Sequence, residues 1–154
     1  MIRFRFIPPL LLAVLSALPV LAREAEIAGP VAAEILRVID GDTLLVEAHP
    51  WPQQRVEVYV RLRGIDTPEL RSACPGERDA AHLARQALTA MAGEGSTVWL
   101  RNIAGDKYFG RIVADVMLPD GRNPAEALRI AGLAVAYEGG GKPAIDCVAT
   151  GAVE

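Results

Sequence analysis

Short apolar runs with alternating polar positions dominate the chain between residues 33 and 118. The clearest of these segments extends from Arg55 to Arg63, where valine or leucine occupies every second position and Glu57, Tyr59 and Arg61 lie between them. A period of two is typical of a strand with one buried face. Other short runs rich in β-branched and aliphatic residues lie at 33–39, 43–47, 97–103 and 111–118. The pattern predicts five strands, and the polar face of the third is available for chemistry.

Two further segments have helical rather than strand periodicity. From Glu77 to Ala92, apolar residues recur at helical spacing, and glycines follow at the end. A shorter helix is expected from Asn123, with a potential cap, a proline at the first helical position and a glutamate in the first turn. Residues 133–137 are expected to be extended. The order of elements indicates a mainly β fold with helices, in the α+β class. A five-stranded OB-fold barrel with two helices fits this order, and another small α+β fold is the alternative from pattern alone.

The two ends of the chain differ in composition from this domain. Arg3 and Arg5 precede an apolar run from Ile7 to Leu21, and small residues surround a potential cleavage site after Ala22. This pattern is typical of a secretory signal peptide. The run is shorter than the roughly 20 residues of a membrane-spanning helix and contains prolines, so an uncleaved anchor is the second interpretation. The expected organisation is a signal peptide at 1–22, a linker at 23–32, a folded domain at 33–137 and a Gly-rich tail at 138–154.

Export to the periplasm or the medium would change the net charge of the protein and would allow its cysteines to form a disulfide. The net charge of −3 would become −5 on loss of Arg3 and Arg5, which gives weak long-range attraction for a polyanion. Cys74 and Cys147 are the only cysteines. In an exported protein we expect an intramolecular disulfide between them, with two free or separately buried thiols as the alternative. No stable membrane association is expected after signal cleavage, and we expect a monomer.

Candidate chemistry collects where the third strand ends. Asp66 and Glu69 lie three positions apart with Pro68 between them, and the fixed φ of proline makes such a loop stiff. If the first three strands form a meander, Asp42 in the preceding hairpin turn meets Asp66. An all-oxygen set of this kind favours Ca²⁺ or Mg²⁺ over zinc. The plainer alternative is that Asp42 only belongs to the turn.

Two arginines accompany these carboxylates. Arg61 lies on the polar face of the third strand, and Arg111 follows the turn at 105–110. Guanidinium groups bind phosphate oxygens bidentately and stabilise the charge that develops during phosphoryl transfer. Cations and carboxylates together suit phosphodiester hydrolysis. Solvated arginines, or salt bridges between them and the same carboxylates, are the alternative.

Three segments resemble the signature motifs of the staphylococcal nuclease-like, or thermonuclease, family. They are residues 39–43, residues 61–69, and Asp106-Lys107-Tyr108 followed by Gly110-Arg111. The similarity covers about residues 33–137. It implies an OB-fold and Ca²⁺-dependent cleavage of DNA and RNA, in which the bond from phosphorus to the 5′ oxygen breaks and a 3′-phosphate remains. Phe109 is an additional residue in the third motif, so the placement of Arg111 depends on how the turn absorbs it.

The resemblance also implies roles for individual residues. Asp42 and Asp66 would bind Ca²⁺ through their carboxylates, and Thr67 would bind it through its main-chain carbonyl. Glu69 would lie beside the metal's water as the general base. The other catalytic residues would hold the phosphate and stabilise the transition state: Arg61 and Arg111. Three residues would contact the nucleotide, with ordinary core or surface positions as the alternative: Lys107, Tyr108 and Tyr137.

Two other classes of function remain open. A non-catalytic OB-fold module would bind single-stranded nucleic acid or another ligand, and an exported envelope domain would use its acidic groups only to bind Ca²⁺. Degenerate nuclease-like domains that bind without cleaving typically lose acidic or arginine residues of the site. This chain keeps all of them: Asp42, Arg61, Asp66, Glu69 and Arg111. The sequence therefore favours an enzyme.

Overall fold

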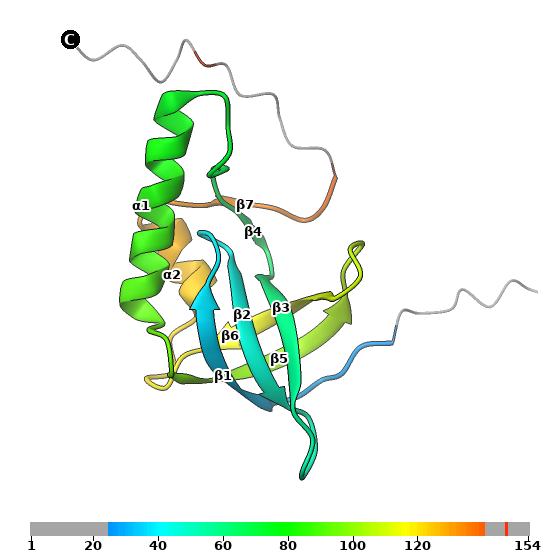
Figure 1. The fold of residues 1–154 in the computed structure, drawn as a ribbon. Coiled ribbons are helices and arrows are strands. Elements are labelled where there is room, and N and C mark those ends of the chain that lie inside the picture. Colours follow the sequence, from blue (N-terminus) through cyan, green and yellow to red (C-terminus); the bar gives the residue numbers. More distant parts are fainter. Residues whose placement is uncertain (1–24, 141–146, 148–154) are drawn as a thin grey trace, which may run out of the picture.

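Five strands close into a barrel, as Figure 1 shows. They are β1 (Val31–Val38), β2 (Thr43–His49), β3 (Val56–Leu62), β5 (Thr97–Gly105) and β6 (Arg111–Met117). Their order is β1-β2-β3-β6-β5, and β1 pairs with β5 to complete the ring. Every pair is antiparallel except β3 with β6. The predicted five-stranded OB-fold barrel is confirmed.

The structure is a computed structural model that describes residues 25–140 and residue 147. The expected signal peptide at 1–22 and most of the expected tail lie outside the described residues. The expected linker lies partly within them, and it is not wholly separate from the barrel. Ile27 forms a bridge with Ile103, and β1 begins at Val31 rather than at residue 33. The folded domain therefore begins earlier than the sequence pattern indicates.

The core follows from the alternation along each strand. In β3, Val60 and Leu62 are buried while Tyr59 and Arg61 are more exposed. Val60 lies opposite Leu44 of β2, which is also fully buried. Full burial of an aliphatic side chain of this size contributes about 1.5–3 kcal/mol. The apolar face of β3 therefore anchors the strand, and the opposite face carries Arg61 outward.

Two helices lie on one side of the barrel (Figure 1). They are α1 (Pro75–Met91) and α2 (Pro124–Ile130), which bury Leu88 and Leu128 against the core. The predicted cap of α2 is confirmed, because the Asn123 side chain accepts a hydrogen bond from the Ala125 N–H at 2.9 Å. Within residues 25–140, no helix is both long and apolar enough to cross a membrane.

A second, two-stranded sheet lies beside the barrel. It pairs β4 (Ile65–Asp66) with β7 (Val135–Ala136), which confirms the extended conformation expected near residue 135. The Tyr137 N–H extends this pairing by donating to the Gly64 carbonyl at 2.9 Å. The predicted disulfide joins Cys74, at the start of α1, to Cys147, and their Cα atoms lie 5.4 Å apart. The chain beyond β7 is thus tied back to the loop that follows β4.

Candidate active site

A cleft of about 1030 Å³ opens where the β1–β2 turn, β3, β4, the β5–β6 turn and the segment after β7 meet. Every metal, catalytic and substrate residue expected from the sequence lines it: Asp42, Arg61, Asp66, Thr67, Glu69, Lys107, Tyr108, Arg111 and Tyr137. These residues come from segments up to 95 positions apart, so their convergence depends on the barrel topology. The structure therefore brings together the groups that the sequence motifs only suggest.

Several contacts hold the Asp42 carboxylate. One carboxylate oxygen accepts hydrogen bonds from the Thr43 hydroxyl at 3.0 Å, and the other accepts from the Thr67 N–H at 3.1 Å. Its main-chain carbonyl accepts from Leu62, at the end of β3, at 2.8 Å. Asp42 is also only 3% exposed. It therefore does more than form a hairpin turn, because it joins that turn to the loop after β4.

Gly41 makes this contact possible. A Cβ atom at this position would lie 2.7 Å from the Ala84 Cβ atom in α1 and 2.9 Å from the Thr67 hydroxyl oxygen. Carbon atoms in van der Waals contact lie about 3.5–4.0 Å apart. The hairpin turn needs glycine here because its backbone packs directly on α1 and on the loop that carries Thr67.

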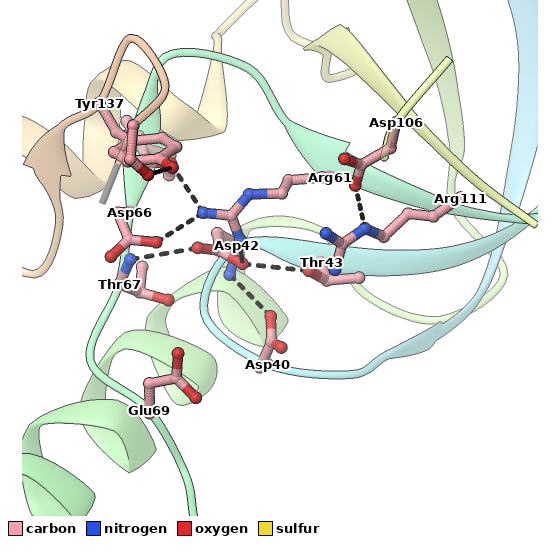
Figure 2. Close-up of polar contacts among 12 residues, drawn as sticks. Asp40, Asp42, Thr43, Arg61, Asp66, Thr67, Glu69, Asp106, Arg111 and Tyr137 are labelled. Carbon is pink, nitrogen blue, oxygen red and sulfur yellow. Dashed lines mark hydrogen bonds and ion pairs between the residues drawn. The ribbon is translucent and has the colours of Figure 1, made fainter. Parts of the chain in front are cut away.

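Arg61 bridges Asp42 and Asp66, as Figure 2 shows. Its Nη1 and Nη2 atoms each lie 2.6 Å from an Oδ1 atom, on Asp42 and Asp66 respectively. All three side chains are at most 16% exposed. Burial alone lowers the pKa of the Arg61 guanidinium, but the two carboxylates outweigh burial and raise it. The net direction is upward. Arg61 therefore remains charged and fixes the two carboxylates side by side.

Asp40 adds a third carboxyl group to this end of the cleft. Burial, and then the negative charge of Asp42, raise the pKa of Asp40 to about 6. Asp40 also accepts a hydrogen bond from the Asp42 N–H at 3.1 Å. A bound cation favours the charged form of neighbouring carboxylates. The raised pKa therefore marks a carboxyl group whose ionisation is opposed first by burial and then by the charge of Asp42.

The donor chemistry of this corner fits a hard cation. Asp42 and Asp66 share one guanidinium, and Thr67 follows Asp66 directly. Between residues 25 and 140, no three His, Cys, Asp or Glu side chains are grouped to hold a metal by themselves. The expected set has two carboxylates and a main-chain carbonyl, so water or substrate oxygens would complete it. Such oxygen donors suit Ca²⁺ or Mg²⁺.

Glu69 is positioned by a residue that the sequence analysis did not single out. The Glu69 N–H donates to the Glu77 carboxylate at 3.2 Å, and Glu77 is only 7% exposed. Glu77 lies in the first turn of α1, where a negative charge is favoured by the helix dipole. The available sequence signal was an acidic residue at the start of a helix, but it does not reveal a partner in the preceding loop.

Arg111 lies in the cleft despite the additional Phe109. The Arg111 N–H donates to the Tyr108 carbonyl at 3.2 Å, and Gly110 has φ of +82°. A type II turn has this hydrogen bond and requires such a φ at its third residue, which favours glycine. Phe109 occupies the second position and is fully exposed, with a relative exposure of 110%. The turn therefore absorbs the extra residue by directing it into solvent.

Two further contacts hold the Arg111 side chain. Its guanidinium carbon lies 4.6 Å from the centre of the Tyr108 ring, and its Nε pairs with Asp106. The Lys107 ammonium lies 5.1 Å from the same ring. Asp106 belongs to the third sequence motif, which by itself gives it no role, and the structure shows that it orients Arg111 from the beginning of the turn (Figure 2). The second cation of the site is thus supported on one wall of the cleft.

Tyr137 supports Arg61 from the opposite side. The guanidinium carbon of Arg61 lies 5.9 Å from the centre of the Tyr137 ring, at the outer limit of a cation–π contact. The Tyr137 hydroxyl donates to the Gly140 carbonyl at 2.7 Å. The segment after β7 therefore forms the last wall of the cleft.

The fold and the cleft together define an OB-fold protein with two arginines beside an acidic corner. Residues 59–146 match the family described as staphylococcal nuclease homologues. The chain belongs to this family, although Asp40 and Asp42 lie before the matched residues. It is also 34% identical over 104 residues to a protein from Escherichia coli named "Uncharacterized endonuclease". This alignment covers 68% of the present chain and 60% of the relative, so the chain spans less than two thirds of the relative's length.

Proposed function

We propose that this protein is an exported nuclease that hydrolyses phosphodiester bonds of DNA and RNA with the help of Ca²⁺, leaving 3′-phosphate ends. One observation carries the proposal. Two guanidinium groups and a set of buried carboxylates line a single cleft on a nuclease-family barrel. Family membership and the endonuclease-named relative support nuclease activity. The oxygen donors support the choice of a hard cation.

Asp42, Asp66 and the Thr67 carbonyl would hold the cation. When bound, Ca²⁺ would offset phosphate charge and help to orient water. Glu69, next to these residues in the loop, would accept the proton of the attacking water. Glu77 would support that task, because its hydrogen bond fixes the main chain of Glu69 at 3.2 Å.

The two arginines would bind the phosphate and stabilise the transition state. Arg61 uses its Nη atoms for the two aspartates and for the Ile65 carbonyl. A guanidinium has five N–H donors, so donors remain for a phosphate oxygen while the carboxylates stay in place. Arg111 approaches from the β5–β6 turn and is held by Asp106 and Tyr108. Lys107, Tyr108 and Tyr137 would contact the nucleotide.

Export is supported by the N-terminal sequence pattern and by the disulfide between Cys74 and Cys147. Disulfides form and persist mainly in oxidising compartments. Intact-mass analysis of protein isolated from the producing cell tests this part. We expect a mass without residues 1–22 and a gain of two hydrogens on reduction, and free thiols would contradict export through an oxidising compartment.

Catalysis is tested with purified protein, single- and double-stranded DNA and RNA, and either Ca²⁺ or a chelator. We expect Ca²⁺-dependent cleavage, reduced about 10²- to 10³-fold in Glu69→Gln and in Arg61→Ala. Arg55→Ala is the matched control, because the Arg55 side chain is 72% exposed and lies just before β3. Equal activity of Arg61→Ala and wild type would exclude the role of Arg61.

Two other outcomes would favour the alternative classes of function. Binding of nucleic acid without cleavage would indicate a non-catalytic OB-fold module. Binding of Ca²⁺ without either would indicate a calcium-binding envelope domain. Both outcomes are seen in the same experiment when Ca²⁺ binding and nucleic-acid binding are measured beside cleavage.

A further inference from the structure

Phe109 stands out among the exposed apolar side chains because of its place in the fold. It is fully exposed, whereas Tyr108 beside it is 55% exposed and lines the cleft. Figure 1 shows the β5–β6 turn projecting from the barrel, and Phe109 lies within that turn. No contact within the described residues explains a large apolar ring at this point. The ring is therefore available to an external partner.

The neighbours of Phe109 indicate the chemistry of that partner. Lys107 and Arg111 both lie within 5.1 Å of the Tyr108 ring centre, so the turn combines two cations with two adjacent aromatic residues. Positive charge combined with aromatic faces is the arrangement by which proteins bind single-stranded nucleic acid, because cations follow the phosphates and rings stack on bases. A lone ring bordered by charged residues is too small an apolar area to favour a protein partner.

We propose that Phe109 forms a base-stacking subsite at the rim of the cleft, which takes an unpaired nucleobase next to the phosphate held by Arg111. This inference rests on the proposed nuclease function and extends it to substrate preference. In a duplex, neighbouring bases already cover both faces of each base. Phe109 can therefore stack on an unpaired base but not on a base inside a duplex, which favours single strands as the substrate.

The backbone of the turn supports this role. Phe109 is the second residue of a type II turn, with Gly110 at φ of +82° in the third position. The hydrogen bond from the Arg111 N–H to the Tyr108 carbonyl fixes the turn. The Phe109 ring therefore projects from a backbone of defined conformation. The same turn carries Arg111 into the cleft. A base on Phe109 and a phosphate on Arg111 are thus placed by one structural unit.

The test measures binding of labelled single- and double-stranded oligonucleotides by fluorescence anisotropy, in chelator and at low salt. We expect Phe109→Ala to bind single strands about 5- to 150-fold more weakly, the factor associated with one stacked base. Duplex binding should change less than about twofold, and Phe109→Trp should retain wild-type affinity for single strands. Trp51→Ala is the matched control, because Trp51 is 60% exposed but lines a separate pocket of the β2–β3 loop.

A set of single strands, each with one abasic position, identifies the contacted base. One position should weaken wild-type binding by the same factor as Phe109→Ala, and should cause no further loss in that variant. In cleavage assays with Ca²⁺, Phe109→Ala should raise KM for single strands and leave kcat nearly unchanged. Because the ring is fully exposed, folding should be unaltered, which a urea denaturation curve verifies.

The outcomes separate this inference from the proposed nuclease function. Cleavage by wild type with no change of single-strand affinity in Phe109→Ala would overturn the base contact and leave the nuclease function standing. Loss of single-strand affinity in Phe109→Ala, with no cleavage by wild type in Ca²⁺, would support the base contact and overturn the nuclease function. Equal losses for single strands and duplexes, or no abasic position that couples to Phe109, would also overturn the contact. Absence of any binding by wild type would overturn it as well.

Discussion

Replacement of Arg61 by alanine tests, independently of catalysis, how much the ion pairs of Arg61 stabilise the cleft. In the structure, Arg61 is paired at 2.6 Å with both Asp42 and Asp66, and the Arg61 side chain is 16% exposed. Removal of one partner from a buried ion pair costs about 3–5 kcal/mol, because the remaining charge is left without compensation. Here two carboxylates would be left together. We therefore expect Arg61→Ala to lower the free energy of unfolding by about 3–5 kcal/mol in chelator.

Urea denaturation followed by circular dichroism measures this change. With a slope of about 2 kcal/mol per molar urea, the expected loss lowers the midpoint by about 1.5–2.5 M. Ca²⁺ should then stabilise the variant more than the wild type, since it would neutralise carboxylates that Arg61 no longer pairs. A cation at about 100 times its Kd contributes about 2.7 kcal/mol.

Arg55→Ala is the control for this experiment. The Arg55 side chain is 72% exposed and contacts Glu47 at 3.2 Å, and an exposed pair of this kind is worth about 0–1 kcal/mol. A wild-type midpoint for Arg61→Ala in chelator would refute the reasoning, because the two aspartates would then not depend on Arg61. If Ca²⁺ raised the free energy of unfolding equally in the variant and the wild type, the link between these carboxylates and the cation would be refuted.

Three more predictions concern the supports of the cleft. Glu77→Ala should lower kcat about 10- to 100-fold by loosening Glu69. Glu77→Gln keeps a hydrogen-bond acceptor and should retain most activity, and steady-state kinetics of both variants measures the difference. Cys147→Ser, or reduction, should lower stability by about 4 kcal/mol in the chain-entropy description, measured by urea denaturation with and without reductant. Gly41→Ala should cost about 1–3 kcal/mol through overpacking and weaken Ca²⁺ binding, measured by calorimetry, because it displaces Thr67; unchanged Ca²⁺ affinity would contradict that coupling.

Much of the site could be predicted because it depends on local pattern and simple topology. The alternation in β3 identified the outward face that carries Arg61, and the hairpin before it brought Asp42 toward Asp66. The structure confirms that these two carboxylates meet, since one guanidinium contacts both. Their roles in metal binding and catalysis remain predictions.

The remaining features depend on contacts that no local pattern encodes. β4 has two residues, too few to show a period, and it forms only because β7 returns beside it. The contact from Glu77 to Glu69 crosses a loop and uses a backbone group. The effect of Phe109 could not be derived from spacing, because it depends on the left-handed φ of Gly110. The first two features depend on contacts between separate segments of the chain, and the third depends on the conformation of a single glycine.

The ends of the cleavage products give the sharpest test of the proposed nuclease activity. A defined oligonucleotide is incubated with wild type in Ca²⁺, and the fragments are analysed by mass spectrometry, beside reactions with chelator and with Asp42→Asn. We predict fragments with 3′-phosphate and 5′-hydroxyl ends from wild type in Ca²⁺, and loss of these fragments in chelator and in the variant. An intact oligonucleotide with wild type in Ca²⁺, or the same fragments at the same rate from Asp42→Asn, would contradict it.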